Sequence, residues 1–194
     1  CKLFPRLKTI HIICLKGELK EILTEQKKGY QGPTEVICAN ILDEKDISLF
    51  HYNIQSDNVN RISYTDITDI TAGEYIYIPN AAVMKSGAWG QLTHSFPDLM
   101  KLDPNTHIFV SDSYLPVFPG RIIQIDDIPD KKKYRLLKGE KFNVVCRNYI
   151  MQAPELEKKL KVTPGGDKYI IGCKCNGHPV LLCGHIVNSH YDKK

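Results

Sequence analysis

DKYIIGCKCNGHPVLLCGHIV, residues 167–187, is the most informative stretch of this 194-residue chain. Two apolar runs, 167–175 and 178–187, flank Asn176-Gly177, a dipeptide that strongly favours a two-residue β-hairpin turn. The turn predicts a register with three opposing pairs: Cys175 with His178, Cys173 with Val180, and Ile170 with Cys183. The chain is therefore expected to end in an antiparallel hairpin.

The same stretch contains residue types that bind zinc, namely Cys173, Cys175, His178, Cys183 and His185. Side chains alternate along a strand, so the predicted register sends Cys183 to the face opposite Cys173 and Cys175. A four-ligand tetrahedral site does not fit this geometry, and we predict no metal site. A three-ligand open site remains one alternative, and two surface cysteines on a hairpin remain the other.

The residues before the hairpin predict an α+β unit spanning 121–190. We expect two strands and two helices there, in the order strand 121–125, helix 131–138, strand 142–149 and helix 155–161. Pro154 suits the start of the second helix. In the first helix, Tyr134, Leu137 and Leu136 are expected to face inward. The element order predicts a mixed α+β sheet with its helices on one face.

A second, smaller α/β unit is predicted at residues 74–120. Its expected elements are a strand at 74–78, helices at 81–85 and 88–96 separated by Ser86-Gly87, and a strand at 107–110. Asn80 is a suitable N-cap for the first helix. A unit of about 45 residues is too small to bury a core alone, so it should pack on its neighbours.

The first 54 residues predict a strand-helix-strand crossover followed by an antiparallel strand. The expected elements are strand 9–15, helix 17–28, strand 35–41 and strand 47–52. Leu19, Ile22 and Leu23 form the apolar stripe of the predicted helix. One helix can cover only one face of such a sheet, and the chain begins at Cys1, so we expect a fragment whose covering partner lies upstream. Residues 55–73 predict a polar linker with one short strand.

Charge is distributed unevenly, with 12 Lys/Arg against 17 Asp/Glu in residues 1–130 and 14 against 5 in residues 131–194. A basic C-terminal third can attract a polyanion such as RNA. The candidate RNA-binding residues are Lys131, Lys132, Lys133, Arg135, Lys138, Lys141 and Arg147, supported by Lys158, Lys159 and Lys161. Tyr134 and Tyr149 could stack on bases. The alternative is a solvated basic surface over tyrosines that belong to the core.

Several other functions are excluded or disfavoured by the sequence. No apolar window reaches the roughly 18 residues of a membrane-spanning helix. Seven thinly spread cysteines favour a reducing cytoplasm. His107, Ser111 and Asp112 lack the Gly-x-Ser-x-Gly elbow of a hydrolase. No Gly-x-Gly-x-x-Gly or Walker sequence occurs, and Gly165-Gly166 predicts a turn rather than a phosphate-binding loop.

Five separated motifs carry a resemblance to a known family: YIYIPNAAVMKSGAW (75–89), PNTHIFVSD (104–112), FPGRI (118–122), VVCRNY (144–149) and GGDKY (165–169). Over residues 5–187 the sequence resembles the C-terminal region of a bacterial family of class I SAM-dependent methyltransferases. The resemblance implies that residues 1–54 close a Rossmann-like methyltransferase domain, that 74–120 form a ferredoxin-like domain and that 121–190 form a THUMP-like domain.

The same resemblance implies a function. The full-length protein would use S-adenosylmethionine bound upstream of Cys1, so no catalytic or cofactor-binding residue is assigned here, and this part alone would be inactive. The THUMP-like domain would present tRNA or rRNA to the methyltransferase domain in cis. Asn80 and Lys85 either face that active site or, as we favour, cap and solvate a helix. The alternative is a structural or dimerisation module with a basic protein-binding face; the oligomeric state stays open.

Overall fold

The computed structural model describes residues 7–54, 62–130 and 132–188, and the chain in it forms two compact units. The first unit comprises residues 1–61 with 79–95, and the second comprises 62–78 with 96–194. Because the position of one unit relative to the other is not determined, each is described separately.

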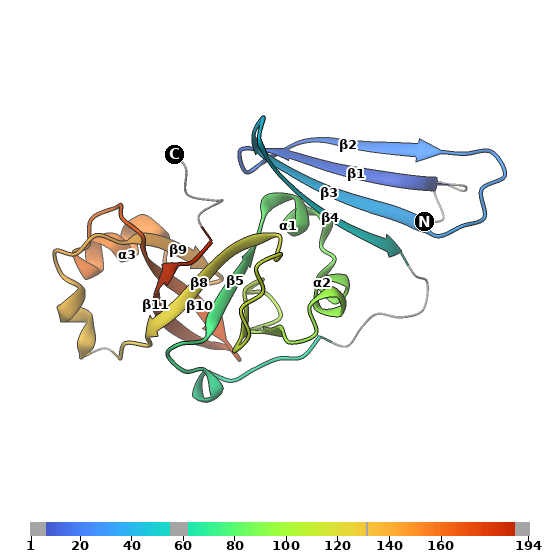
Figure 1. Cartoon of the computed structure of the whole chain (residues 1–194). Coiled ribbons are helices and arrows are strands. Elements are labelled where there is room, and N and C mark those ends of the chain that lie inside the picture. Colours follow the sequence, from blue (N-terminus) through green and yellow to red (C-terminus); the bar gives the residue numbers. More distant parts are fainter. Residues whose placement is uncertain (1–6, 55–61, 131, 189–194) are drawn as a thin grey trace. The chain divides into compact units, whose positions relative to one another are not determined.

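A four-stranded sheet forms the first unit, with strand order β2-β1-β3-β4. Its elements are β1 (Leu7–Leu15), β2 (Glu18–Gln26), β3 (Thr34–Asp43), β4 (Asp46–Ile54), α1 (Ala81–Ser86) and α2 (Trp89–Ser95). β1 and β3 are parallel, and β4 pairs antiparallel with β3, as predicted. Helix α1 packs on β1 and β3 (Figure 1). Its Ala82 and Val83 are buried, as are Cys14 and Cys38 on these strands.

The helix predicted at residues 17–28 is wrong, because this segment is the edge strand β2, paired antiparallel with β1. Lys16 and Gly17 both have positive φ, 50° and 83°, and form the two-residue turn that starts the hairpin. A register irregularity between Ile13 and Cys14 adds one residue to β2. The irregularity explains the helix-like spacing, because Leu19 and Ile22 lie three residues apart yet pair with Cys14 and Ile12 on one face.

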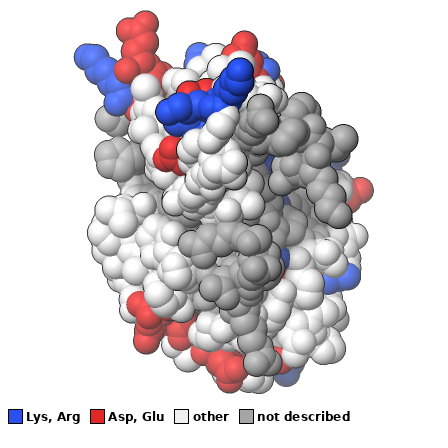
Figure 2. Space-filling model, turned by 90° about the vertical axis from the view of Figure 1, so that its right-hand side faces the viewer, with Lys and Arg blue, Asp and Glu red and all other residues white. Residues whose placement is uncertain are grey.

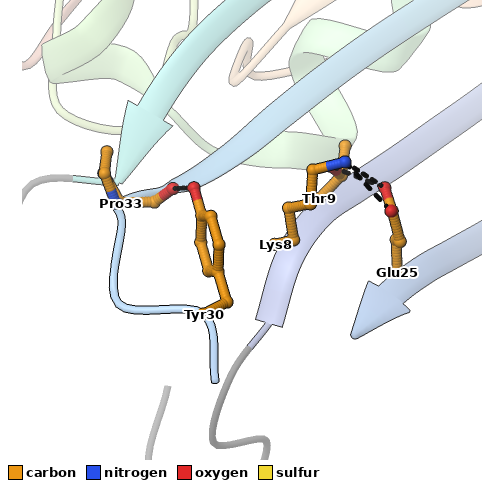
Figure 3. Close-up of polar contacts among 5 residues, drawn as sticks. All are labelled: Lys8, Thr9, Glu25, Tyr30 and Pro33. Atoms are coloured by element: carbon orange, nitrogen blue, oxygen red, sulfur yellow. Dashed lines mark hydrogen bonds and ion pairs between the residues drawn. The ribbon is translucent and has the colours of Figure 1, made fainter. Parts of the chain in front are cut away.

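Polar contacts hold this edge and the connection that follows it (Figure 3). Lys8 Nζ lies 3.0 Å from Glu25 Oε1 across β1 and β2, and the hydroxyl of Thr9 donates to Glu25 Oε2 at 3.2 Å. In the loop to β3, the hydroxyl of Tyr30 donates to the carbonyl oxygen of Pro33 at 2.8 Å. With β2 in place of the predicted helix, the described residues 7–54 form strands only, and the expected methyltransferase-type strand-helix-strand unit is not present.

One seven-stranded sheet runs through the second unit, in the order β6-β7-β5-β8-β11-β10-β9. The strands are β5 (Tyr75–Pro79), β6 (Met100–Lys101), β7 (Phe109–Ser111), β8 (Gly120–Asp127), β9 (Asn143–Arg147), β10 (Lys168–Cys175) and β11 (His178–Ile186). The β10–β11 register is the predicted one, including the pairs Cys175–His178 and Ile170–Cys183. Since β5 and β8 are neighbours, both predicted α/β regions contribute to one sheet.

Each face of this sheet has its own hydrophobic core. One core lies around Ile76, Ile108, Ile125 and Ile171, and it also includes Ile70, just after the 3₁₀ helix η1 (Ile67–Asp69). The other is covered by helix α3 (Ala153–Leu160) and the 3₁₀ helix η2 (Lys133–Leu137). The helices of the C-terminal region thus lie on one face, as predicted.

Three expectations for this region are corrected by the structure. The helix predicted at 131–138 is only the short 3₁₀ helix η2, and Leu136, expected to face inward, is 71% exposed. Cys173 and Cys175 are fully buried rather than surface cysteines, because both lie on the side of β10 that faces the first core.

Within the described residues, no helix is both long and apolar enough to cross a membrane.

Candidate nucleic-acid interface

The basic residues of the C-terminal region gather mainly over the second core. We define the basic face as the cations of η2 and α3 with those that directly adjoin them: Lys132, Lys133, Arg135, Lys138, Lys158, Lys159 and Lys161. All seven residues are exposed. Because η2 and α3 pack beside each other on the same side of the sheet, these cations share one surface.

Apolar anchors fix the two elements that carry the basic face. Leu156 and Leu160 lie one helical turn apart on α3 and are buried in the second core. Tyr134 and Leu137 of η2 pack against the same core. The remaining positions of both elements therefore point to solvent, which is why their lysines and arginines are exposed.

Backbone caps hold the starts of both elements. Asp130 Oδ1 accepts hydrogen bonds from the backbone N–H groups of Lys132 at 2.9 Å and Lys133 at 3.0 Å. At α3, Gln152 and Glu155 form a capping box, with the Gln152 N–H donating to Glu155 Oε2 at 2.9 Å. The carboxylates of Asp130 and Glu155 therefore accept backbone N–H groups at the starts of η2 and α3.

Acidic neighbours neutralise only part of this positive charge. Lys133 Nζ pairs with Asp127 Oδ1 at 3.1 Å. Outside the basic face, Lys168 pairs with Glu140 at 3.4 Å. The other six cations of the basic face form no ion pair within 4 Å with a residue that the structure describes. The surface thus has a surplus of positive charge available to an anionic ligand.

The structure separates Arg147 from the other candidate RNA-binding residues. Val144 and Cys146 of β9 pack on the second core, whereas Val145 packs on the first. By alternation, Arg147 lies on the face of Val145, opposite the basic face. Its charge acts on His107 there, whose pKa is lowered first by burial and then by the nearby Lys101 and Arg147 cations.

The remaining candidate RNA-binding residues, Lys141, Lys131, Tyr134 and Tyr149, do not belong to the basic face. Lys141 is exposed in the segment before β9 and forms an isolated bridge with Thr163. Lys131 lies outside the described residues. Tyr134 and Tyr149 pack against the second core, and burial raises the pKa of each. This placement favours the core interpretation of both tyrosines over base stacking.

Asn80 is the N-cap of α1, as predicted. Its side-chain Oδ1 accepts the N–H of Val83 at 3.0 Å, and its amide donates to the hydroxyl of Ser48 at 3.3 Å. Lys85 is exposed in the last turn of the same helix, where a cation complements the helix dipole. The contacts of Asn80 thus include those of a helix cap, the role that the sequence favoured for it.

Sequence reasoning missed a buried acidic node at Asp103, whose carboxylate is the acceptor of three hydrogen bonds. Its Oδ1 accepts from the N–H of Asn105 at 3.0 Å and from the amide of Asn148 at 3.3 Å, and its Oδ2 accepts from the N–H of Gly177 at 2.9 Å. The sequence Asp103-Pro104-Asn105 is typical of an Asx-turn and could have indicated the first of these contacts. The node connects the loop before β7 with the β10–β11 turn.

The cysteines of the hairpin do not form a metal site in the structure. Among the described residues, no group of three or more His, Cys, Asp or Glu side chains is placed to hold a metal ion. Burial raises the pKa of Cys175 to about 11 and that of Cys183 to about 12, and it also raises the pKa of Cys173 strongly. These buried, protonated thiols are poor nucleophiles.

The charge distribution on one side of the molecule is visible in Figure 2. Lysine and arginine side chains there lie in small groups, interspersed with aspartate and glutamate and separated by uncharged surface. Among the residues coloured in this view, no broad area of a single sign is seen.

The paired glycines Gly165-Gly166 lead into strand β10 rather than into a helix N-terminus, so they do not form the loop that binds a nucleotide-type ligand. Both have positive φ, 124° and 79°, which is the geometry of a turn. No step of a methyl transfer is therefore assigned to these residues.

Comparison with known proteins gives two domain matches and one structural neighbour. Residues 75–119 match a family described as a ferredoxin-like domain, and residues 121–185 match one described as THUMP domain-like. No curated protein matches the sequence. A crystal structure from Porphyromonas gingivalis W83, described as a "putative methyltransferase", is similar with 26% sequence identity and a TM-score of 0.78. The match covers 94% of this chain but only 46% of that protein.

Proposed function

We propose that this chain is the substrate-recognition part of an S-adenosylmethionine-dependent methyltransferase that acts on RNA, with the cofactor site outside these 194 residues. The observation that carries the proposal is the basic face of η2 and α3. In the proposed role, this surface binds the phosphate backbone and holds the RNA for a catalytic domain of the same protein. RNA binding of this type depends on charge and shape rather than on reading a base sequence.

Three further findings support the proposal. The basic face lies within the region that matches the THUMP-like description, and domains of that kind are associated with RNA modification. The similar protein from P. gingivalis is described as a "putative methyltransferase". This chain spans about half of that protein's length, which leaves room there for a separate catalytic domain.

Binding of bulk tRNA to the purified 194-residue chain across a salt series tests the proposal. If about five cations contact phosphates, affinity should fall roughly a hundredfold for a fourfold rise in salt, because each contact releases about 0.7 counterion. Heparin competition should displace the RNA. Absence of tRNA binding at low salt would contradict the proposal and favour the alternative, a structural module whose basic face binds acidic protein.

A further inference from the structure

The four-stranded sheet of the first unit has one covered face and one open face. On the covered face, Ile12, Cys14, Val36 and Cys38 are at most 7% exposed. Ala82 and Val83 of α1, the helix that packs on β1 and β3, are buried. The residues that alternate with these along each strand point to the open face. The register shows how they align across the four strands.

Strand pairing arranges the open face in three adjacent rows. The first row is Leu23, His11, Ile37 and His51, the second is Glu21, Ile13, Ala39 and Leu49, and the third is Glu18, Leu15, Ile41 and Ile47. Eight of these twelve side chains are aliphatic. We call this group, Ile13, Leu15, Leu23, Ile37, Ala39, Ile41, Ile47 and Leu49, the apolar patch.

Four side chains of the apolar patch are exposed in the first unit, and the other four are half-buried. Leu49 is 55% exposed, Ile47 53% and Leu23 48%. Polar groups lie at its margin, where His51 Nδ1 lies 3.2 Å from Glu35 Oε1 and where Glu18 and Glu21 occupy the edge strand. A contiguous apolar surface with a polar margin is typical of an interface that is buried in the assembled protein.

The strand directions point to the same conclusion. β1 and β3 are a parallel pair at the centre of the sheet, and both carry apolar residues on both faces, which is the pattern of parallel strands buried on both sides. In this unit α1 covers one face only. The P. gingivalis protein matches 94% of this chain, and more than half of its own length lies outside the match. A protein of that kind therefore contains enough additional chain to cover the second face.

We infer that the apolar patch is the docking surface for a further domain of the same polypeptide, the catalytic domain of the proposed methyltransferase. This inference rests on the proposed function for the identity of the domain. The docking surface has an aliphatic centre formed by β1, β3 and β4. The complementary surface on the partner domain is accordingly apolar, with polar groups that meet Glu21 and the Glu35–His51 pair at the margin.

Carbene footprinting of side chains, on the 194-residue chain and on the product of the complete reading frame that contains it, tests this inference. In the 194-residue chain, Ile47, Leu49 and Leu23 should be labelled at every protein concentration. In the complete protein their labelling should be lost, while Val117, which is 81% exposed and lies in the second unit, stays labelled. Substitution Leu49→Lys in the complete protein should restore labelling of Ile47 and Leu23.

The matched control is Ile22→Lys, because Ile22 is 58% exposed on the same sheet but pairs with Ile12 on the other face. It should leave the footprint of the complete protein unchanged. Equal labelling in both proteins, or a reading frame that adds no further domain, would overturn the inference. Protection already present in the 194-residue chain would also overturn it, and if that protection disappeared on dilution the occupant would be a second copy.

The footprint and the RNA-binding assay can fail independently. Loss of labelling without tRNA binding would leave a docked domain but refute the proposed function. Binding of tRNA with an unchanged footprint would support the proposed function and refute the docking surface.

Discussion

The backbone N–H of Gly177 donates to Asp103 Oδ2 at 2.9 Å, so the tip of the β10–β11 hairpin is tied to the loop that follows β6. The two residues belong to different matched regions, the ferredoxin-like and the THUMP-like one. Asn176 strengthens this connection, because its N–H donates to the carbonyl oxygen of Leu102 at 2.9 Å. The second unit is therefore held together at this point by side-chain and backbone contacts as well as by its sheet.

Replacement of Asp103 by alanine should destabilise the protein by about 3 kcal/mol, because it removes the acceptor for the Gly177, Asn105 and Asn148 donors in a site that is 7% exposed. Urea unfolding measures the effect. Asp98→Ala, at an exposed position of the same unit, should change the free energy of unfolding by less than about 0.5 kcal/mol. Equal effects of the two substitutions would contradict the role given to Asp103.

Gly184→Ala should weaken the junction between β8 and β11. A methyl group at Gly184 would collide with the carbonyl oxygen of Gln124, a backbone atom that cannot move without breaking the strand pair. We expect a loss of about 3 kcal/mol in thermal or urea unfolding. Gly177→Ala is the matched control. Its site is open, so the only cost is the strain of an alanine at a φ of +80°, about 1–2 kcal/mol. A smaller effect at Gly184 than at Gly177 would be inconsistent with this packing.

Tyr77 should make the stability of the protein decrease at alkaline pH. Its hydroxyl donates to the Ser113 carbonyl oxygen at 2.5 Å and accepts the Leu115 N–H at 3.0 Å, and burial raises the pKa of Tyr77 to about 12. The pKa in the unfolded chain is about 10, so the stabilisation is complete below pH 10 and is lost between pH 10 and 12.

Unfolding free energies of the wild type and Tyr77→Phe between pH 8 and 12 test this dependence on Tyr77. The variant should be less stable at pH 8, because the Leu115 N–H loses its acceptor, but its stability should fall less steeply above pH 10. Cys175 and Cys183 are retained in both proteins, so their own alkaline titration cancels in the comparison. Parallel curves for the two proteins would show that Tyr77 does not cause the decrease.

The basic face should be distinguishable from the opposite side of the sheet by a matched pair of charge reversals. Arg135→Glu should weaken tRNA binding several-fold and reduce the slope of affinity against salt by about 1, because one phosphate contact is lost. Arg147→Glu, which makes the same chemical change on the other face, should have a much smaller effect. A filter-binding salt series compares the two, and an equal loss in both would argue against the basic face as the RNA-binding surface.

The sequence predicted much of the second unit because its signals there are local. Asn176-Gly177 specifies both the turn and the register of the β10–β11 hairpin, and in the first unit Asn80 likewise specifies the start of α1. Residues 131–138 were harder to predict, since the run of lysines has helical propensity but only Tyr134 and Leu137 find apolar partners. Propensity favoured a full helix at this point, whereas packing produces a short 3₁₀ helix.

The prediction failed at β2 because its pattern fits two structures. Glu, Lys and Leu favour a helix, and Leu19 and Ile22 have helical spacing, but the strand is specified by Lys16-Gly17 and by pairing with β1. The candidate site shows a similar limit. Arg147 carries the same charge as the cations of the basic face and lies near them in sequence, but strand alternation places its side chain on the opposite face of the sheet. This becomes evident only once β9 is placed in the sheet.

The neighbouring position of β5 and β8 restricts how such a chain can be rearranged in evolution. The two matched regions meet around Gly120, but a gene rearrangement that separated them there would leave unsatisfied backbone hydrogen-bonding groups along both strands. A lineage that lost or replaced either region alone would thus inherit an aggregation-prone protein. The ferredoxin-like and THUMP-like regions are therefore expected to be inherited together.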